Sequence, residues 1–133
     1  MSIRCMLIEP QKDAQIIYLE DTEYSTLKGF IGGILGRTPV GDMPGLYILA
    51  DDEFLYKEGM VFNRKVFGQL FYGTLLIAAE DPNEFDPEGY ISMTDEQVAW
   101  VNEYMGKAPD ISETPTLEEK ADYLSHASQV YPL

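Results

Sequence analysis

The chain has 133 residues, of which 45% are hydrophobic and 24% charged, and it carries a formal net charge of −14. This length suits one domain with a single core, and this composition excludes an intrinsically disordered chain. No run approaches the roughly 20 apolar residues that a membrane span requires, and the N-terminal run reaches Glu9 too soon for a signal peptide.

The negative charge is concentrated toward the C-terminus. Residues 1–80 carry eleven acidic and seven basic side chains, whereas residues 81–133 carry twelve acidic and two basic ones. We therefore expect an α+β core over residues 1–80 and an acidic helical extension over residues 81–133, packed on the same domain. The negative field repels nucleic acid and anionic membranes as direct partners, and it favours a partner protein with a basic surface.

Metal and disulfide chemistry are limited by a scarcity of ligands. Cys5 is the only cysteine and His126 the only histidine, which allows no internal disulfide and no thiolate zinc site. Cys5 lies in an apolar strand pattern, where a buried and inert thiol is expected instead of a nucleophile. We therefore expect no metal and no cofactor, and a reducing, cytoplasmic location.

The first predicted elements are two strands and a helix. Apolar runs at residues 3–8 and 15–20 are close enough to pair as a hairpin. Apolar residues then recur at helical spacing, which predicts a helix over about residues 23–33. Gly32-Gly33 or Gly36 is expected to end this helix, because glycine tolerates the left-handed conformation; the glycine spacing does not match a phosphate-binding loop.

The middle of the chain predicts further strands. Residues 46–50 form one strand after a loop rich in proline and glycine, and an acidic turn leads from it to residues 54–56 as a second hairpin. Residues 60–71 are ambiguous and indicate a short helical turn or a loop. Residues 72–79 form the most apolar run, which predicts a central strand covered on both faces.

Two capping boxes predict the C-terminal helices. Thr94 with Gln97 opens the first, which is expected to stop at Gly106, and Thr116 with Glu119 opens a short final helix to about His126. The predicted fold class is therefore α+β: a mostly antiparallel sheet with one packed helix, followed by two C-terminal helices.

Asn63 and Arg64 are candidate ligand-binding residues. They place planar, multi-donor groups beside aromatic residues, a combination that suits recognition of carboxylates, phosphates or base edges. The alternative is that Arg64 ties a loop to backbone carbonyls or to one of the many acidic side chains. Arg37 is a further candidate if the ligand resembles a nucleotide.

The acidic C-terminal residues also have two interpretations. They form either a solvated helical surface or a patch of carboxylates that binds a partner and imitates a phosphate backbone. The candidate partner-binding residues are Asp86, Glu88, Asp95, Glu96, Glu103, Glu118, Glu119 and Asp122.

Three motifs in order resemble the domain-of-unknown-function 3846 family of phage and mobile-element proteins. They are Leu7-Ile8-Glu9-Pro10, the segment from Leu27 to Gly33, and Phe62-Asn63-Arg64 followed by Gly73-Thr74-Leu75-Leu76-Ile77. The resemblance covers about residues 5–80 and leaves the acidic C-terminal part outside. It implies a phage origin, and so the cytoplasm of a host cell, but no catalytic activity.

We therefore expect a non-enzymatic phage accessory protein that binds a host protein, for example as an anti-defence inhibitor or a DNA mimic. One alternative is a homo-oligomer that sequesters a nucleotide-like signalling molecule through Asn63, Arg64 and Arg37. Another is a small enzyme that uses a pair of carboxylates not distinguished by any motif.

Overall fold

The computed structural model describes residues 2–53, 59–81 and 89–130, with side chains described as far as Ser125. Its elements, in chain order, are β1 (Ile3–Ile8), β2 (Gln15–Leu19), α1 (Tyr24–Ile31), β3 (Leu35–Pro39), β4 (Leu46–Asp51), β5 (Phe62–Val66), β6 (Gln69–Tyr72), β7 (Leu75–Ala79), α2 (Asp95–Met105), a 3₁₀ turn (Ile111–Glu113) and α3 (Leu117–Val130).

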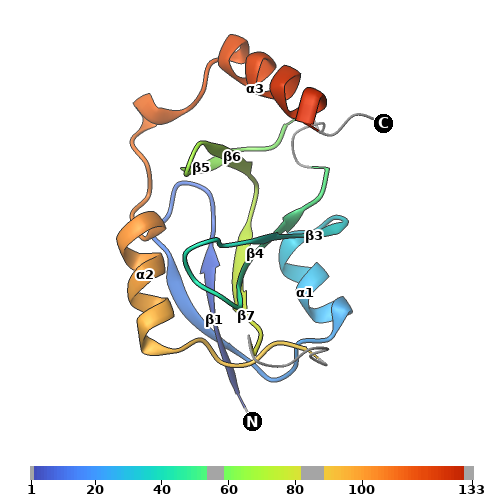
Figure 1. Ribbon diagram of the computed structural model, residues 1–133, viewed down its shortest axis with the longest axis vertical. Helices are drawn as coiled ribbons and strands as arrows, with labels where there is room; N and C mark the ends of the chain where they lie inside the picture. The colour runs from blue at the N-terminus through green and yellow to red at the C-terminus, as the bar shows by residue number, and fades with distance from the viewer. Residues whose placement is uncertain (1, 54–58, 82–88, 131–133) are drawn as a thin grey trace.

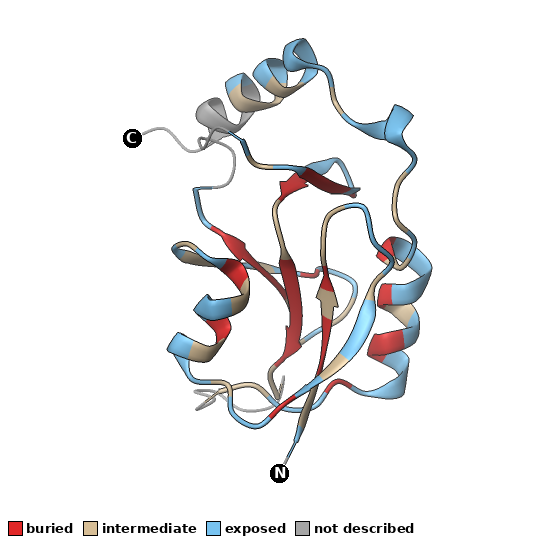
Figure 2. Ribbon diagram, turned by 180° about the vertical axis from the view of Figure 1, so that it is seen from behind, coloured by how far each residue is buried: buried red, intermediate tan, exposed pale blue. Residues whose placement is uncertain are grey.

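The main sheet has five antiparallel strands in the order β2-β1-β7-β4-β3, and β5 and β6 form a separate hairpin. Strand β7 lies at the centre, and all five of its residues are buried (Figure 2). The predicted α+β class, with an antiparallel sheet, one packed helix and two C-terminal helices, is confirmed. Because a central strand is covered on both faces, the unbroken apolar run was a reliable signal.

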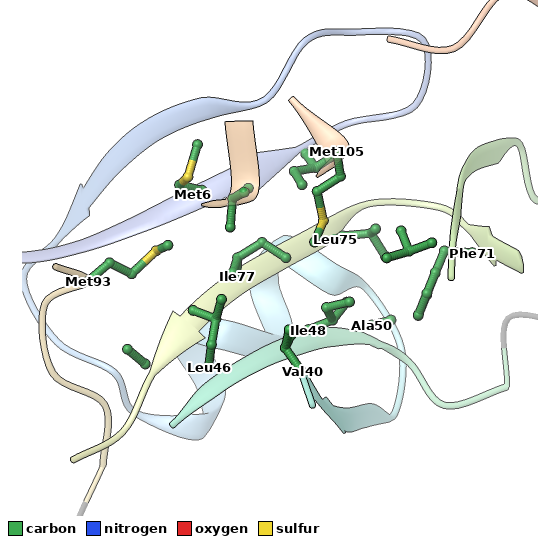
Figure 3. Close-up of a cluster of buried hydrophobic side chains, with 14 of the residues drawn as sticks. Met6, Val40, Leu46, Ile48, Ala50, Phe71, Leu75, Ile77, Met93 and Met105 are labelled. Carbon is green, nitrogen blue, oxygen red and sulfur yellow. The ribbon is translucent and has the colours of Figure 1, made fainter. Parts of the chain in front are cut away.

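Helices α1 and α2 cover opposite faces of the sheet (Figure 1). Leu27 and Ile31 of α1 pack on the face that carries Leu76 and Ala78. The other face carries the larger cluster, in which Ile77 and its neighbours meet the apolar side of α2 (Figure 3). Val98, Val101 and Met105 supply that side, so α2 is part of the main core.

The β5–β6 hairpin lies between the main core and helix α3. Val66 and Phe71 point into the main cluster. Phe62, Leu70 and Tyr72 form a small cluster on the other face, against Tyr123 of α3. Helix α3 is otherwise largely exposed where its side chains are described (Figure 2).

Several local predictions are confirmed. Strands β1 and β2 pair as a hairpin, and α1 ends at Gly32, which has φ 81° and donates its N–H to the Lys28 carbonyl at 2.7 Å. The Thr94–Gln97 capping box opens α2. Gly106 follows α2 as expected but stays in the right-handed region, with φ −73°, so it does not end the helix through the left-handed conformation.

The predicted hairpin of residues 46–50 with residues 54–56 is wrong in its pairing. Strand β4 pairs with β3 on one side and β7 on the other. The sequence predicts a loop where β3 lies, because this segment contains Gly36 and Pro39. An edge strand tolerates proline, since one side of its backbone has no ladder to complete. Residues 54–56 lie outside the described residues.

Residues 60–71 form neither a helical turn nor a loop but most of the β5–β6 hairpin. Tyr72 ends β6 instead of beginning the central strand, because Gly73 has φ 80° and breaks the run before Leu75. The final helix runs to Val130, about one turn beyond the predicted end. Among the described residues, no helix combines the length and the apolar character that a membrane crossing needs.

Candidate protein-binding surface

Asn63 and Arg64 are buried, with 0% and 3% of their surfaces exposed. The Asn63 amide donates to the carbonyls of Ile8 at 2.8 Å and Gly73 at 2.7 Å. The Arg64 guanidinium donates to the carbonyls of Met105 at 2.7 Å and Lys12 at 2.6 Å, and to the Asn63 side-chain oxygen at 2.6 Å. The pair therefore ties β5 to the β1–β2 turn and to the end of α2.

This geometry favours the structural alternative for Arg64, since backbone carbonyls occupy its donors. Burial lowers the pKa of the Arg64 guanidinium, and the charge of Asp13 acts in the opposite direction. A buried cation that is satisfied by neutral carbonyls holds segments together without presenting its charge to solvent.

Arg37 lies on the other face of the sheet, beside the α1-side cluster that contains Tyr47 and Tyr90. Its guanidinium stacks 4.0 Å from the centroid of the Tyr47 ring and 5.5 Å from that of Tyr90, and it forms an ion pair with Glu80. Because Arg64 contacts the end of α2, the sheet separates the two arginines. The three candidate ligand-binding residues are not brought together.

The acidic candidates fall into two groups on different helices. Asp95, Glu96 and Glu103 are exposed on α2, where Asp95 forms an ion pair with Arg4 at 2.9 Å. On α3 the exposed candidates are Glu118, Glu119 and Asp122, of which Glu119 completes the capping box with Thr116. Asp86 and Glu88 lie outside the described residues. Figure 1 places α2 beside the sheet and α3 beyond the hairpin.

Phe67, Trp100 and Tyr104 form an aromatic triad at the surface. The ring centroids lie 4.9 Å apart for Trp100 and Tyr104, 5.5 Å for Phe67 and Tyr104, and 5.9 Å for Phe67 and Trp100. Phe67 is 66% exposed and Tyr104 is 49% exposed. Aromatic residues that stay accessible to solvent while packed on one another are typical of the centres of protein interfaces.

Phe67 is held in an unfavourable backbone conformation. It occupies the first position of the two-residue turn between β5 and β6, with φ 46°, and Gly68 follows with φ 83°. Such a turn favours Asn-Gly, because a bulky residue in the left-handed region costs about 1–2 kcal/mol. Phe67 therefore sits where local folding alone would select another residue, a pattern associated with functional sites.

A groove adjoins the triad and shares two of its rings. It has a volume of about 200 Å³, and its walls include Pro39, Val40, Ile48, Val66, Phe67 and Trp100. We call it the corner groove, because it opens where the end of β3 meets the tip of the hairpin and α2.

Carboxylates flank this apolar surface. Glu96 and Glu103 are exposed, and they lie about one helical turn before and after Trp100, on the same side of α2. Asp42 is also exposed and follows the lining residue Gly41 in the chain. An apolar centre with a charged rim is the common arrangement of a protein-binding surface.

The geometry gives less support to acid–base catalysis or to metal binding. Asp21 has a lowered pKa, because its carboxylate accepts hydrogen bonds from the Thr26 hydroxyl and the Glu23 N–H; a general acid needs a raised one. Within the described residues, no group of three histidine, cysteine or acidic side chains is placed to hold a metal ion.

Comparisons with known proteins provide no relative: no family model, no curated protein and no solved structure matches the chain. The candidate surface therefore rests on its geometry. The sequence predicts the carboxylates of α2 as partner contacts but not the triad. Trp100 and Tyr104, four residues apart on one predicted helix, were the available signal, whereas the place of Phe67 depended on the unrecognised hairpin.

Proposed function

We propose that the protein acts by binding a partner protein with a basic surface, through the aromatic triad and the carboxylates around it. The observation that carries this proposal is the exposed Phe67, kept in a left-handed turn against Trp100 and Tyr104. A buried phenylalanine would need no partner to explain it. An exposed phenylalanine in a strained turn gains its largest favourable contact when a partner protein covers the ring.

The charge distribution supports a cationic partner. Glu96 and Glu103 are exposed about one helical turn from Trp100, Asp42 is exposed next to the groove residue Gly41, and the whole chain carries a net charge of −14. Complementary charge accelerates encounter and disfavours acidic competitors. Aromatic faces add a direct attraction for arginine and lysine.

For the biological setting we propose the one that the family resemblance implies. The protein is then a phage accessory protein that binds a host protein, for example to block a defence pathway. A DNA mimic is one form of this function. It requires a partner that also binds DNA, so that DNA and this protein compete for it. The nucleotide-binding oligomer gains no support, because Arg37 and Arg64 lie on opposite faces of the sheet.

Affinity capture with the full-length chain tests the proposal. Extracts of candidate bacterial hosts are passed over the wild-type chain and over Phe67→Asn, and each captured protein is then purified and titrated directly. We expect a basic partner whose affinity falls at least tenfold with Phe67→Asn and decreases as salt is added.

Tyr24→Asn is the matched control, because Tyr24 is an aromatic residue that is 57% exposed on α1, on the opposite face of the sheet from α2. It should leave the affinity unchanged. A purified partner that binds Phe67→Asn as tightly as the wild type would place its contact elsewhere and refute the proposal.

The same titration tests the carboxylates beside the triad. Glu96→Lys with Glu103→Lys changes the carboxylates beside the triad, whereas Glu20→Lys with Glu118→Lys makes the same change in net charge at exposed positions elsewhere. Only the first pair should weaken binding strongly. Deleting residues 81–133 is unsuitable as a test, because Val101 and Met105 would leave the core.

A further inference from the structure

The corner groove and the aromatic triad form one continuous surface with two kinds of subsite. Phe67 and Trp100 belong to both, so a ligand that enters the groove also contacts the triad. The groove is lined by apolar groups such as Val40 and Ile48, whereas Glu96 and Glu103 flank the outer side of Trp100. Groove and carboxylates therefore select for different side chains of the same ligand.

The groove fits an apolar anchor. Its volume of about 200 Å³ accommodates one medium-sized aliphatic side chain, and Val40, Ile48 and Val66 offer apolar contacts beside the polar Thr38 and Gln69. Removing such a side chain from water is a main source of affinity at small interfaces. A charged side chain in the same place would lose its hydration without a partner of opposite sign in the groove wall.

The rim fits cations on both sides of that anchor. Asp42 is exposed and follows the lining residue Gly41, whereas Glu96 and Glu103 are exposed about one helical turn from the lining residue Trp100 on α2. An arginine at the α2 end meets both the face of an aromatic ring and a carboxylate, two contacts that reinforce each other.

The charge also argues against two other occupants. A second copy of this chain would bring another net charge of −14 against the same acidic rim. A nucleic acid would meet the same repulsion through its phosphates.

We infer that the surface binds a segment of a partner protein in which one aliphatic residue is flanked on both sides by arginine or lysine. The aliphatic side chain occupies the corner groove, and the basic side chains pair with Asp42 at one end and with Glu96 or Glu103 at the other. This inference rests on the proposed function and specifies the kind of segment recognised.

Trp100 provides a direct probe, because it is the only tryptophan of the chain and forms part of the site. The full-length protein is titrated with capped peptides in which leucine is flanked by one arginine on each side, separated from it by one, two or three glycines. Binding is followed through the emission of Trp100 at low and moderate salt. At least one spacing should give a saturable change.

Three matched changes identify the contacts. Replacing leucine by serine in the best peptide should weaken binding about tenfold or more, since the groove loses its anchor. Phe67→Asn in the protein should weaken it to a similar extent. Glu96→Lys with Glu103→Lys should weaken it several-fold at low salt and reduce its salt dependence, whereas Glu20→Lys with Glu118→Lys should change neither. Circular dichroism checks that each variant is folded.

The results distinguish this inference from the proposed function. If the serine peptide binds as tightly as the leucine peptide, or if Phe67→Asn leaves peptide binding unchanged, the inferred segment is wrong. If no peptide changes the emission while a captured partner still depends on Phe67, the inference falls and the proposed function stands. A partner that ignores Phe67 overturns both.

Discussion

The Arg64 guanidinium donates from its Nε to the carbonyl of Met105 at 2.7 Å, and so fastens the β5–β6 hairpin to the last residue of helix α2. This contact sets the distance between the hairpin tip and the helix surface. Because Phe67 is on that tip and Trp100 is on that helix, the residue proposed from sequence as a ligand contact instead positions the surface that lies beside it.

Arg64→Met should destabilise the fold by about 2–4 kcal/mol, because it leaves the buried Met105 carbonyl, the part-buried Lys12 carbonyl and the Asn63 side-chain oxygen without their donor. Urea denaturation measures the free energy of unfolding. Lys65→Met is the control: Lys65 is exposed and lies next to Arg64 on β5, so we expect a loss below about 1 kcal/mol. Equal losses would mean that the Arg64 contacts add nothing to stability.

Phe67→Asn should change the free energy of unfolding by less than about 1 kcal/mol, since relief of the left-handed backbone offsets the lost ring contacts. Phe67→Ala removes the same ring contacts but does not relieve the left-handed backbone as asparagine does. The alanine variant should therefore be less stable than the asparagine variant. Thermal and urea unfolding of both variants test the order. The reverse order would show that turn strain is not the dominant effect.

Thr94→Ala should cost about 1 kcal/mol of global stability, because it removes the acceptor of the Gln97 N–H at the start of α2. Thr116→Ala removes the equivalent hydrogen bond to the Glu119 N–H at the start of α3. Helix α2 supplies Val101 and Met105 to the core, whereas α3 is mostly exposed where described. The second change should therefore appear mainly as faster hydrogen exchange in α3. Equal effects on global unfolding would contradict this difference.

Stability should decline above about pH 9. Burial raises the pKa of the Cys5 thiol from 9.0 to about 11, and burial also raises the pKa of Tyr72 and Tyr90. These groups are neutral when protonated, so the unfolded chain releases their protons first as pH rises. The stability that each group contributes is fully present below the ordinary pKa of that group, and it is lost as pH rises through the pKa that the group has in the folded state.

Cys5→Ala isolates the thiol. Between the two thiol pKa values, the wild type should lose up to about 1.4 kcal/mol per pH unit more than this variant. Urea denaturation across that range gives the difference. An aromatic disulfide reagent at pH 8 should react with Cys5 only after unfolding, since the thiol is fully buried. Rapid reaction in the folded state would contradict its burial.

Elements with one dominant local signal could be predicted from sequence. The apolar run that contains Leu75–Ala79, the Thr94 capping box and the stop at Gly32 each depend on neighbouring residues alone. Strand β3 could not, because Gly36 and Pro39 suit a loop equally well and only the exposed sheet edge accepts them.

The candidate surface was predictable only in part. Net charge pointed to Glu96 and Glu103, but their position beside an apolar centre required the helix and the hairpin to be placed together. The turn at Phe67-Gly68 lacks the asparagine or aspartate that usually marks such a hairpin. Phe67 occupies a left-handed turn position that asparagine or aspartate would normally fill, and this hides the β5–β6 hairpin in the sequence. The same unusual residue choice makes Phe67 a candidate contact.

The strand order has a consequence for how the chain is made. The hairpin of β1 and β2 leaves the ribosome early, and β3 with β4 follows, yet these two halves of the sheet meet only through β7. Until Leu75–Ala79 has emerged, the edges of β1 and β4 that pair with β7 have no partner strand. The hydrogen bonds between Arg4 and Met93 form only after residue 93 has also been synthesised. The five-stranded sheet therefore cannot be completed before Leu75–Ala79 has been synthesised, and until then its unpaired strand edges are open to aggregation.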